Sequence, residues 1–226
     1  MSADTFEAAE HARFTGWLRE RSEPDWTAAT EHDFTDRLAA GTLSEDAFAT
    51  YLVQDIQFVE ALTSVIGHAA GQAHSTDAAV TLAEFLTLVG TDETDYFERA
   101  FDALDVPAAE RTDPDRWPVT EQFADLLGRA AREGGYAETL SVLVPVEWVY
   151  LEWGERAADG DRPDAFYFDE WIDLHAGEGF RETVAFLREE LDAVGPDLSP
   201  RRQARVARHF ERAVELEVAF FDAAAE

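Results

Sequence analysis

The spacing of apolar residues constrains this chain more than any other feature of its sequence. Aliphatic and aromatic residues recur at intervals of three and four almost throughout the 226 residues, which places them on one face of an α-helix. The strict alternation that marks half-buried strands is almost absent. The sequence therefore predicts an all-α protein, with helices at Phe6–Arg21, Trp26–Leu38, Glu45–Gln72, Asp77–Leu104, Pro118–Glu133, Tyr136–Ala158, Pro163–His175, Gly177–Val194 and Pro200–Ala225.

Residues that start or stop helices stand at these borders. Ser44 precedes the third predicted helix and Ser75 precedes the fourth, where a side-chain oxygen can accept a hydrogen bond from a free backbone N–H. Gly134 and Gly135 end the fifth helix, and Pro200 stands in the first turn of the last. The borders therefore rest on local chemistry as well as on the apolar pattern.

The chain is expected to form one helical domain that spans residues 1–226, because single domains commonly reach ~200 to 250 residues. The longest break in the apolar pattern, Val106–Trp117, is polar and is expected to be a loop within the bundle. Hydrophobic residues make up 46% of the chain and aromatic residues 12%, which is enough apolar surface to offset the entropy lost on folding.

The charge is strongly negative: 48 acidic residues stand against 18 basic ones, all of them arginine, for a net charge of −30. At molar salt the Debye length falls to ~3 Å, and dense surface carboxylates no longer repel one another strongly. The composition therefore indicates a halophilic protein. This charge, without any basic run, also argues against partners such as nucleic acids and anionic membranes.

The chain contains no cysteine, so disulfides, thiolate metal sites and cysteine nucleophiles are excluded. No apolar run is long enough to span a membrane, and the first residues lack the basic flank and apolar stretch of a signal peptide. A cytoplasmic location is expected.

The third predicted helix carries a carboxylate among apolar residues. Tyr51, Asp55 and Phe58 share one face through their i, i+4, i+7 spacing, and Val59 and Leu62 extend that face towards the core. A buried carboxylate is costly unless it is paired or hydrogen-bonded. Asp55 is therefore expected either to brace the helices through a buried ion pair or network, or to bind a ligand.

The last predicted helix repeats this pattern. Phe210, Val214, Phe220 and Phe221 form an apolar stripe with Glu217 in its middle. A position at the solvated edge of the stripe stays open for this glutamate. If both acids point inward, two carboxylates in an aromatic space suit a flat, nitrogen-rich ligand that offers hydrogen bonds from ring nitrogens or amino groups.

Two further segments carry candidate residues. Pro145 lies inside the sixth predicted helix, where a proline removes a backbone hydrogen bond and favours a bend, and Tyr150 follows on the same helix. Glu152 and Arg156, spaced i and i+4, are predicted to form an ion pair. His175 is open to a structural or a site role, and the remaining histidines show no metal-ligand spacing.

Four motifs in this order resemble the TenA/thiaminase II family, whose members are all-helical with the heme-oxygenase-like fold. The motifs are F-x-x-Y-L-x-Q-D-x-x-F from Phe48, P-V-E-W-V-Y-x-E-x-G-E-R from Pro145, W-I-x-x-H from Trp171 with Phe180, and E-V-A-F-F-D-A-A from Glu217. Their order and spacing agree with the family across nearly the whole chain, so the resemblance implies the same helical bundle.

The resemblance implies a role in the salvage of thiamin pyrimidines, in which water removes a group from the exocyclic methylene of an aminopyrimidine. Asp55 occupies the position of the family's pyrimidine-binding aspartate and Glu217 that of its catalytic glutamate. Phe58, Tyr150 and Phe220 match aromatic or phenolic positions of the pocket. No cofactor and no metal is implied.

The departures from the family pattern are equally informative. The usual nucleophilic cysteine falls at Val146, and two pocket tyrosines fall at Phe123 and His175. The chain resembles the branch that lacks the cysteine, which is associated with hydrolysis of amino- and formylamino-methylpyrimidines. The hypothesis is that Glu217 acts as general acid and base toward the exocyclic amine and one water molecule, while Asp55 orients the ring and aromatic stacking excludes bulk solvent. Glu147 is a candidate second acid if the proline bend turns it inward.

Two other readings remain open at this point. The chain could be a non-catalytic pyrimidine-binding or regulatory protein that kept the pocket after losing the nucleophile. It could also be a di-iron oxidase of the same fold, for which Glu152 and His175 are available as ligands but a second histidine pair is missing. Family resemblance leads us to expect a homotetramer.

Overall fold

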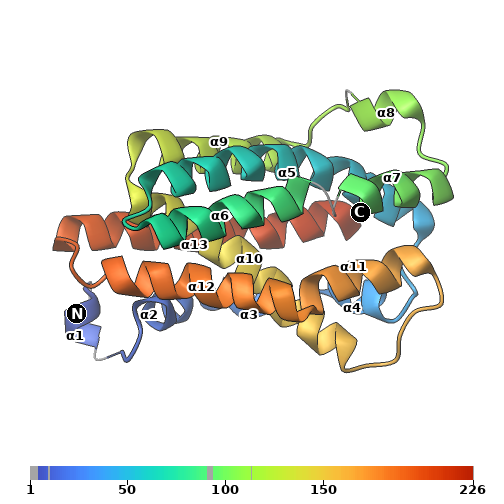
Figure 1. Cartoon of the computed structure of the whole chain (residues 1–226). Helices are drawn as coiled ribbons and strands as arrows, with labels where there is room; N and C mark the ends of the chain where they lie inside the picture. The colour runs from blue at the N-terminus through green and yellow to red at the C-terminus, as the bar shows by residue number, and fades with distance from the viewer. Residues whose placement is uncertain (1–4, 10, 91–93, 113, 226) are drawn as a thin grey trace.

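The computed structural model describes residues 5–9, 11–90, 94–112 and 114–225. In this part of the chain every regular element is a helix (Figure 1), and no strand occurs. The helices are α1 (Phe6–Ala9), α2 (Phe14–Arg21), α3 (Asp25–Thr30), α4 (Asp33–Ala39), α5 (Glu45–Gln72), α6 (Thr76–Leu88), α7 (Thr94–Ala103), α8 (Ala108–Thr112), α9 (Pro118–Glu133), α10 (Tyr136–Ala158), α11 (Phe166–Ala176), α12 (Glu178–Val194) and α13 (Pro200–Ala225).

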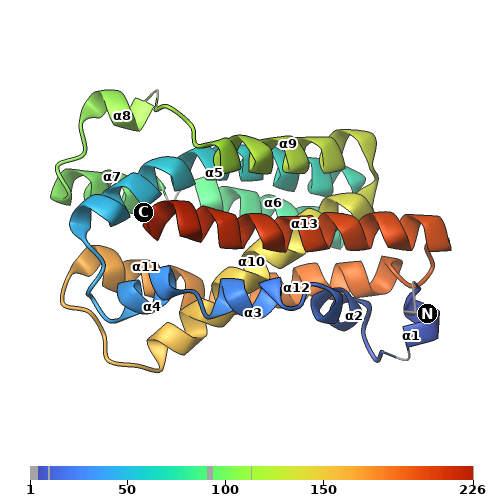
Figure 2. The same cartoon turned by 180° about the vertical axis from the view of Figure 1, so that it is seen from behind.

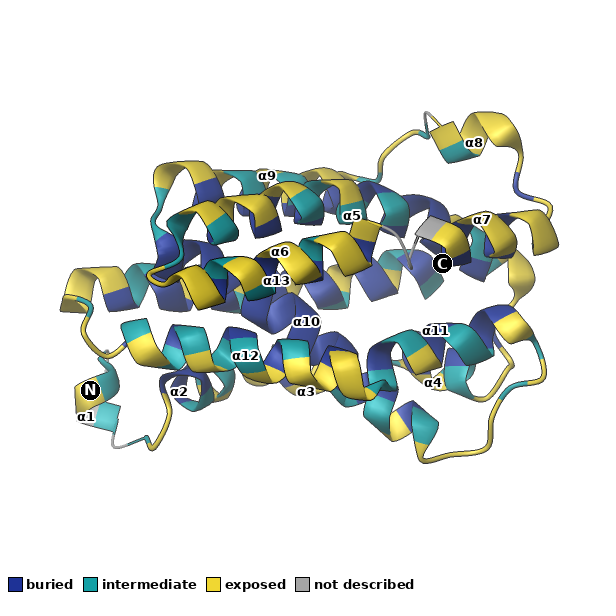
Figure 3. Ribbon diagram, in the orientation of Figure 1, coloured by how far each residue is buried: buried dark blue, intermediate teal, exposed yellow. Residues whose placement is uncertain are grey.

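Helix α10 is the centre of the bundle. It crosses between α5, α6, α9 and α13 on one side and α2, α3, α4, α11 and α12 on the other (Figures 1 and 2). Nearly all of its residues are buried, whereas the outer helices expose one face (Figure 3). A helix segment that is apolar all round can only be stable inside the protein, which agrees with the unbroken apolar run Val142–Val146.

The caps that the sequence predicts are present. The side-chain oxygen of Ser44 accepts a hydrogen bond from Ala47 N at 3.2 Å, and that of Ser75 accepts one from Ala78 N at 3.1 Å. Pro118 stands in the first turn of α9, where its missing N–H costs no helical bond. Helices α5, α9, α10 and α13 begin and end at the predicted residues.

Three of the other predicted helices are divided or shorter. Phe6–Arg21 contains α1 and α2, and Trp26–Leu38 contains α3 and α4. The second break has a local cause, because the ring nitrogen Nδ1 of His32 accepts a hydrogen bond from Phe34 N and so caps α4. Predicted helix Pro163–His175 loses its first turn, since α11 starts at Phe166.

Two helices cover the predicted helix Asp77–Leu104: α6 ends at Leu88, residues 89–90 continue as a π-helical turn, and α7 begins at Thr94. Residues 91–93 of that segment lie outside the described residues. The expected loop Val106–Trp117 contains the short helix α8, which has no buried residue and protrudes from the bundle (Figures 1 and 2).

The predicted ion pair between Glu152 and Arg156 is also wrong. Arg156 pairs with Asp36 of α4 at 2.8 Å, and Glu152 accepts a hydrogen bond from Trp26 Nε1 at 2.9 Å. Both side chains therefore find partners on neighbouring helices rather than one turn away on α10.

Gln54 ties α5 to the segment that leads into α9. Its side-chain oxygen accepts hydrogen bonds from Trp117 N at 2.9 Å and Thr120 Oγ1 at 2.8 Å, and its nitrogen donates to the Asp115 carbonyl at 3.0 Å. Both polar atoms of this buried amide are thereby hydrogen-bonded. The contact fixes α5, and with it the next residue, Asp55, against the core.

No described helix combines the length with the apolar character that spanning a lipid bilayer requires.

Candidate active site

A small pocket lies between α5, α10 and α11. Each helix supplies side chains at helical spacing, so that one face of each points to the same space. The lining residues are Asp55, Phe58, Val59 and Leu62 from α5, Val146, Glu147 and Tyr150 from α10, and Trp171 and His175 from α11. The centres of water-sized molecules can reach about 30 Å³, which is room for a small number of waters. An aromatic ligand therefore requires some of these side chains to move.

Asp55 is 3% exposed and stands at the end of a hydrogen-bonded chain that two tyrosine hydroxyl groups form. The Tyr51 and Tyr150 hydroxyl oxygens lie 2.8 Å apart, and the Tyr150 hydroxyl donates to Asp55 Oδ1 at 3.4 Å. Burial raises the pKa of both tyrosines well above its usual value, and the nearby Asp55 raises it further. Both phenols therefore stay protonated and can serve as hydrogen-bond donors.

Glu217 of α13 lies beside the pocket and is 2% exposed. Its Oε1 atom is buried and has no hydrogen-bond partner in the structure. Burial raises the pKa of Glu217 well above its usual value, and the neighbouring Asp55 and Glu147 raise it further. The protonated form is favoured, so Glu217 is a carboxylic acid held next to two other carboxyl side chains.

Glu147 lies in the lining of the pocket, although its helical phase relative to Val146 and Tyr150 did not require this. Because every residue of α10 from Tyr136 to Leu151 is buried, the helix has no solvated face at this point to which a glutamate could turn. Val146, where the resemblance led us to expect the family's cysteine to fall, lines the same pocket.

His175 presents a neutral ring to the pocket. Its Nδ1 atom lies 2.8 Å from the Trp171 carbonyl oxygen, so Nδ1 carries the proton that is donated and Nε2 is left as an acceptor. Burial lowers the pKa of His175 to about 4, against the smaller opposing effect of the Trp171 carbonyl. The ring packs on Tyr150 at 4.8 Å and on Trp171 at 4.5 Å between centroids.

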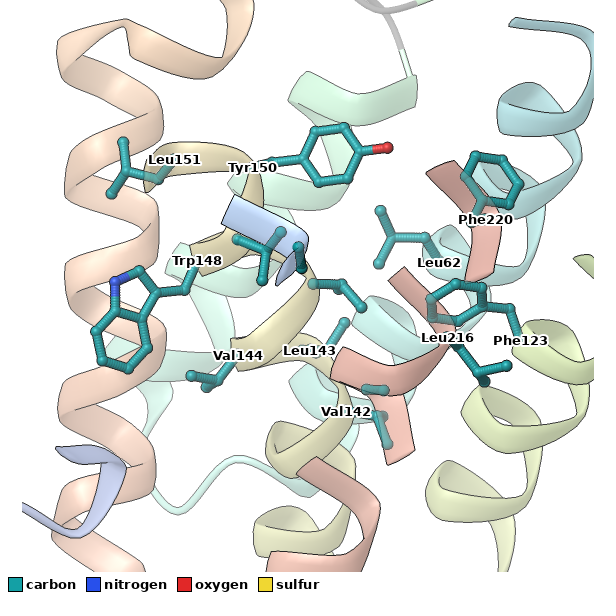
Figure 4. Packing of buried hydrophobic residues seen from close by; sticks show 14 of the residues in the cluster. Leu62, Phe123, Val142, Leu143, Val144, Trp148, Tyr150, Leu151, Leu216 and Phe220 are labelled. Carbon is teal, nitrogen blue, oxygen red and sulfur yellow. The ribbon is translucent and has the colours of Figure 1, made fainter. Parts of the chain in front are cut away.

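Three phenylalanines form the aromatic side of the site. Phe58 lines the pocket and contacts Phe123 at 5.1 Å, and Phe123 lies 6.3 Å from Phe220. Phe123 and Phe220 are not among the lining residues and pack behind them. Figure 4 shows the Tyr150 hydroxyl directed towards the side on which Phe220 lies.

The structure also adds residues that sequence reasoning did not assign to the site. Trp171 lines the pocket one turn before His175, and Tyr51 lies one turn before Asp55 and 5.7 Å from Phe220. The signal was available in both cases, because each aromatic residue precedes a chosen site residue by four positions on the same helical face.

The arrangement of donors does not favour a metal centre. Among the described residues, no group of three or more His, Asp and Glu side chains is placed to hold a metal ion. Glu152, one of the two residues considered for a di-iron centre, bonds to Trp26 and lies 3.5 Å from Arg19.

Comparison with known proteins agrees with this picture. A family model described as "TENA/THI-4/PQQC family" matches residues 19–226. Two relatives carry the name aminopyrimidine aminohydrolase: the protein of Halalkalibacterium halodurans is 23% identical over 93% of this chain and 95% of its own, and that of Bacillus subtilis is 25% identical over 88% and 84%.

Among solved structures, a TenA family transcription regulator from Silicibacter sp. TM1040 superposes with a TM-score of 0.85 at 22% identity. The match covers 94% of this chain and 96% of the other. At this level of identity the likeness concerns the fold, and the fold is shared from end to end. With the family model spanning α2 to α13, the chain belongs to the TENA/THI-4/PQQC family.

Proposed function

We propose that the protein hydrolyses small aminopyrimidines derived from thiamin, converting amino- or formylamino-methylpyrimidine to hydroxymethylpyrimidine. The observation that carries the proposal is the arrangement of three buried carboxyl groups from three helices: Asp55 and Glu147 line one aromatic pocket, and Glu217 lies behind the lining, close enough for both of them to raise its pKa. The two relatives named aminopyrimidine aminohydrolase, which match this chain over most of their length, support the same substrate class.

Binding is assigned to Asp55 and its neighbours. A carboxylate can accept hydrogen bonds from an exocyclic amino group and from a protonated ring nitrogen at the same time. Tyr150 orients the carboxylate through its hydroxyl at 3.4 Å, while Phe58 and Trp171 offer apolar faces to a flat ring. The neutral His175 adds a further acceptor for an amino group.

Catalysis is assigned to Glu217, with Glu147 as its partner. The bond between the exocyclic methylene carbon and nitrogen breaks, and a new bond forms from that carbon to the oxygen of water. The protonated Glu217 gives its proton to the departing amine, and a carboxylate takes one from the water. Glu147 fits the second role, because its charge is one of the causes that raise the pKa of Glu217.

A covalent route through a thiolate has no residue to carry it. The chain contains no cysteine, and the position after Pro145 is Val146. The small size of the pocket also favours a compact leaving group such as ammonia over the bulky thiazole of thiamin itself. By the same step the formylamino substrate would release formamide.

The direct test is product analysis. Purified protein in molar KCl is incubated separately with aminomethylpyrimidine, formylaminomethylpyrimidine and thiamin, and hydroxymethylpyrimidine is measured by mass spectrometry. We expect the first two to be converted. The E217Q variant should lose roughly 10²- to 10⁴-fold in kcat while its Kd for the substrate changes little. E215Q, which alters an exposed glutamate of α13, is the matched control.

The results of these assays distinguish the proposed enzyme from a binding protein of the same fold. Equal hydrolysis by E217Q and E215Q would refute the role of Glu217. Tight pyrimidine binding without any turnover by the unaltered protein would refute the enzyme and favour a binding or regulatory protein of the same fold.

The wider setting is proposed on composition and resemblance. A cytoplasm of molar salt suits the net charge of −30, and one domain of residues 1–226 assembled as a homotetramer suits the family. Sedimentation analysis in molar KCl tests the last of these.

A further inference from the structure

A cluster of arginine and tryptophan lies on the side of α10 away from the pocket. Trp148 projects from α10 in a different direction from Tyr150 (Figure 4). The guanidinium carbon of Arg188, from α12, lies 3.6 Å from the centre of a Trp148 ring, and that of Arg19, from α2, lies 5.9 Å from it. Two cations from distant parts of the chain therefore meet at one indole.

The donors of Arg188 have no protein acceptor. Among the described residues it forms no ion pair and no hydrogen bond, and its Nε atom is buried without a partner. The Nε atom of Arg19 is buried without a partner as well. A guanidinium group carries five N–H donors, so this is a notable deficit in a chain with 48 acidic residues and only 18 basic ones.

The two carboxylates nearest to the cluster are already engaged. Asp192 accepts hydrogen bonds from Arg13 Nε at 2.5 Å and from Thr15 N at 2.6 Å. Glu152 accepts from Trp26 Nε1 at 2.9 Å and pairs with Arg19 Nη2 at 3.5 Å, so in the described part of the chain the guanidinium group of Arg188 is the one left without a carboxylate partner. Neither turns to Arg188 with a hydrogen bond, although acidic residues are plentiful elsewhere on the protein.

The local field is correspondingly positive. Burial lowers the pKa of Arg188, and the charges of Arg13 and Arg19 lower it further, while Asp192 and Glu152 act in the opposite direction. Three guanidinium groups thus face two carboxylates. In a molecule whose overall charge is −30, this is a place where an anion is attracted rather than repelled.

We propose that Arg188 and Arg19 form a binding site for a small inorganic anion, which is chloride at the salt concentration that the composition indicates. The contact of Arg188 with the Trp148 ring at 3.6 Å holds the guanidinium group in place and leaves its N–H groups for the anion. Because the ligating residues come from α2 and α12 and rest on α10, the bound anion holds the two outer helices to the central one.

Crystals grown or soaked in KBr test the site directly. Bromide replaces chloride and gives an anomalous diffraction signal, so we expect a peak within contact distance of both Arg188 and Arg19. The absence of a peak there overturns the proposal.

Thermal unfolding provides the second test. Potassium chloride is replaced stepwise by potassium gluconate at constant ionic strength, and the midpoint is measured for the unaltered protein, R188M and R201M. Methionine at 188 keeps an apolar stem over Trp148. Arg201 is exposed and forms no ion pair with any described residue, so R201M controls for the loss of one charge.

We expect chloride to raise the midpoint of the unaltered protein and of R201M by roughly 2 to 4 °C more than that of R188M. An identical chloride dependence in R188M and R201M overturns the proposal. Millimolar phosphate serves as a second probe: a midpoint rise that R188M abolishes supports the site with an oxyanion as its occupant.

Discussion

Tyr51 and Tyr150 stand 99 positions apart in the chain, yet their hydroxyl oxygens lie 2.8 Å from each other. The contact joins α5 to α10 at the point where Asp55 faces the pocket. The Tyr150 hydroxyl in turn donates a hydrogen bond to Asp55 Oδ1. Since burial keeps both phenols protonated, the direction of the Asp55 carboxylate depends on the Tyr150 hydroxyl.

Removing that hydroxyl should impair substrate binding. In Y150F the hydrogen bond to Asp55 is lost while the ring stays, and kcat/KM for aminomethylpyrimidine should fall roughly 10-fold, the effect of about 1.4 kcal/mol. The matched control is Y136F on the same helix, whose hydroxyl donates to Glu190 at 2.7 Å instead. Steady-state kinetics in molar KCl measure both, and equal values for the two variants would contradict the role given to Tyr150.

The raised pKa of Glu217 predicts how stability depends on pH. Folded protein keeps this proton above pH 4.5, the ordinary value, whereas the unfolded chain releases it. The stability that the protonated glutamate contributes is therefore complete below that pH and is lost as pH rises through the folded pKa. E217Q has no such group, so its free energy of unfolding relative to the unaltered protein should increase with pH. Denaturant titrations from pH 4.5 to 8 measure the difference, and a constant difference would argue against a buried, protonated Glu217.

His175 predicts the opposite dependence. Burial lowers its pKa from 6.5 to about 4, so the unfolded chain binds a proton in this interval that the folded protein does not. Stability is complete above pH 6.5 and is lost as pH falls to about 4, by up to roughly 3 kcal/mol. The H175Q variant should lack this part of the acid destabilisation. The same pH slope in both proteins would show that the ring takes up its proton without unfolding.

Gly154 offers a test of the contact between α10 and α11. An added Cβ would lie 2.9 Å from the backbone carbonyl of His175, and backbone atoms cannot turn aside. G154A should therefore lower the free energy of unfolding by roughly 1 to 3 kcal/mol and displace His175 from the pocket. At Gly67 on α5 an added Cβ meets no atom within 4 Å, so G67A should stabilise the protein by about 0.5 to 1 kcal/mol. Thermal unfolding measures whether G154A lowers and G67A raises the stability of the protein. An unchanged stability of G154A would mean that α11 can shift away from the added methyl group.

The long helices could be predicted because their information is local. Ser44 caps α5 through its own side chain, and the face that carries Tyr51, Asp55 and Phe58 follows from the helical period alone. The inward position of Asp55 and Glu217 could be predicted for the same reason, since each interrupts an apolar stripe. The apolar stripe on α5 did not decide between the two interpretations of Asp55, a residue of a bracing network or a residue that binds a ligand.

Other features depend on contacts between helices that no local pattern encodes. Glu147 lines the pocket at a point where α10 is buried on every side. Arg156 pairs with Asp36 of α4, and Glu152 is bonded to Trp26 of α3. The break before α4 has a local cause, because the ring nitrogen of His32 caps the helix. It was not predicted, since histidine is an uncommon cap.

The protruding helix α8 has a practical consequence for experiments on this protein. Its residues contribute nothing to the core, and Ala109 is exposed. Because the chain contains no cysteine, a single thiol introduced at Ala109 would be unique in the molecule. A fluorophore, spin label or surface tether could then be attached at one defined point, well separated in sequence from the pocket helices, without first removing any native residue.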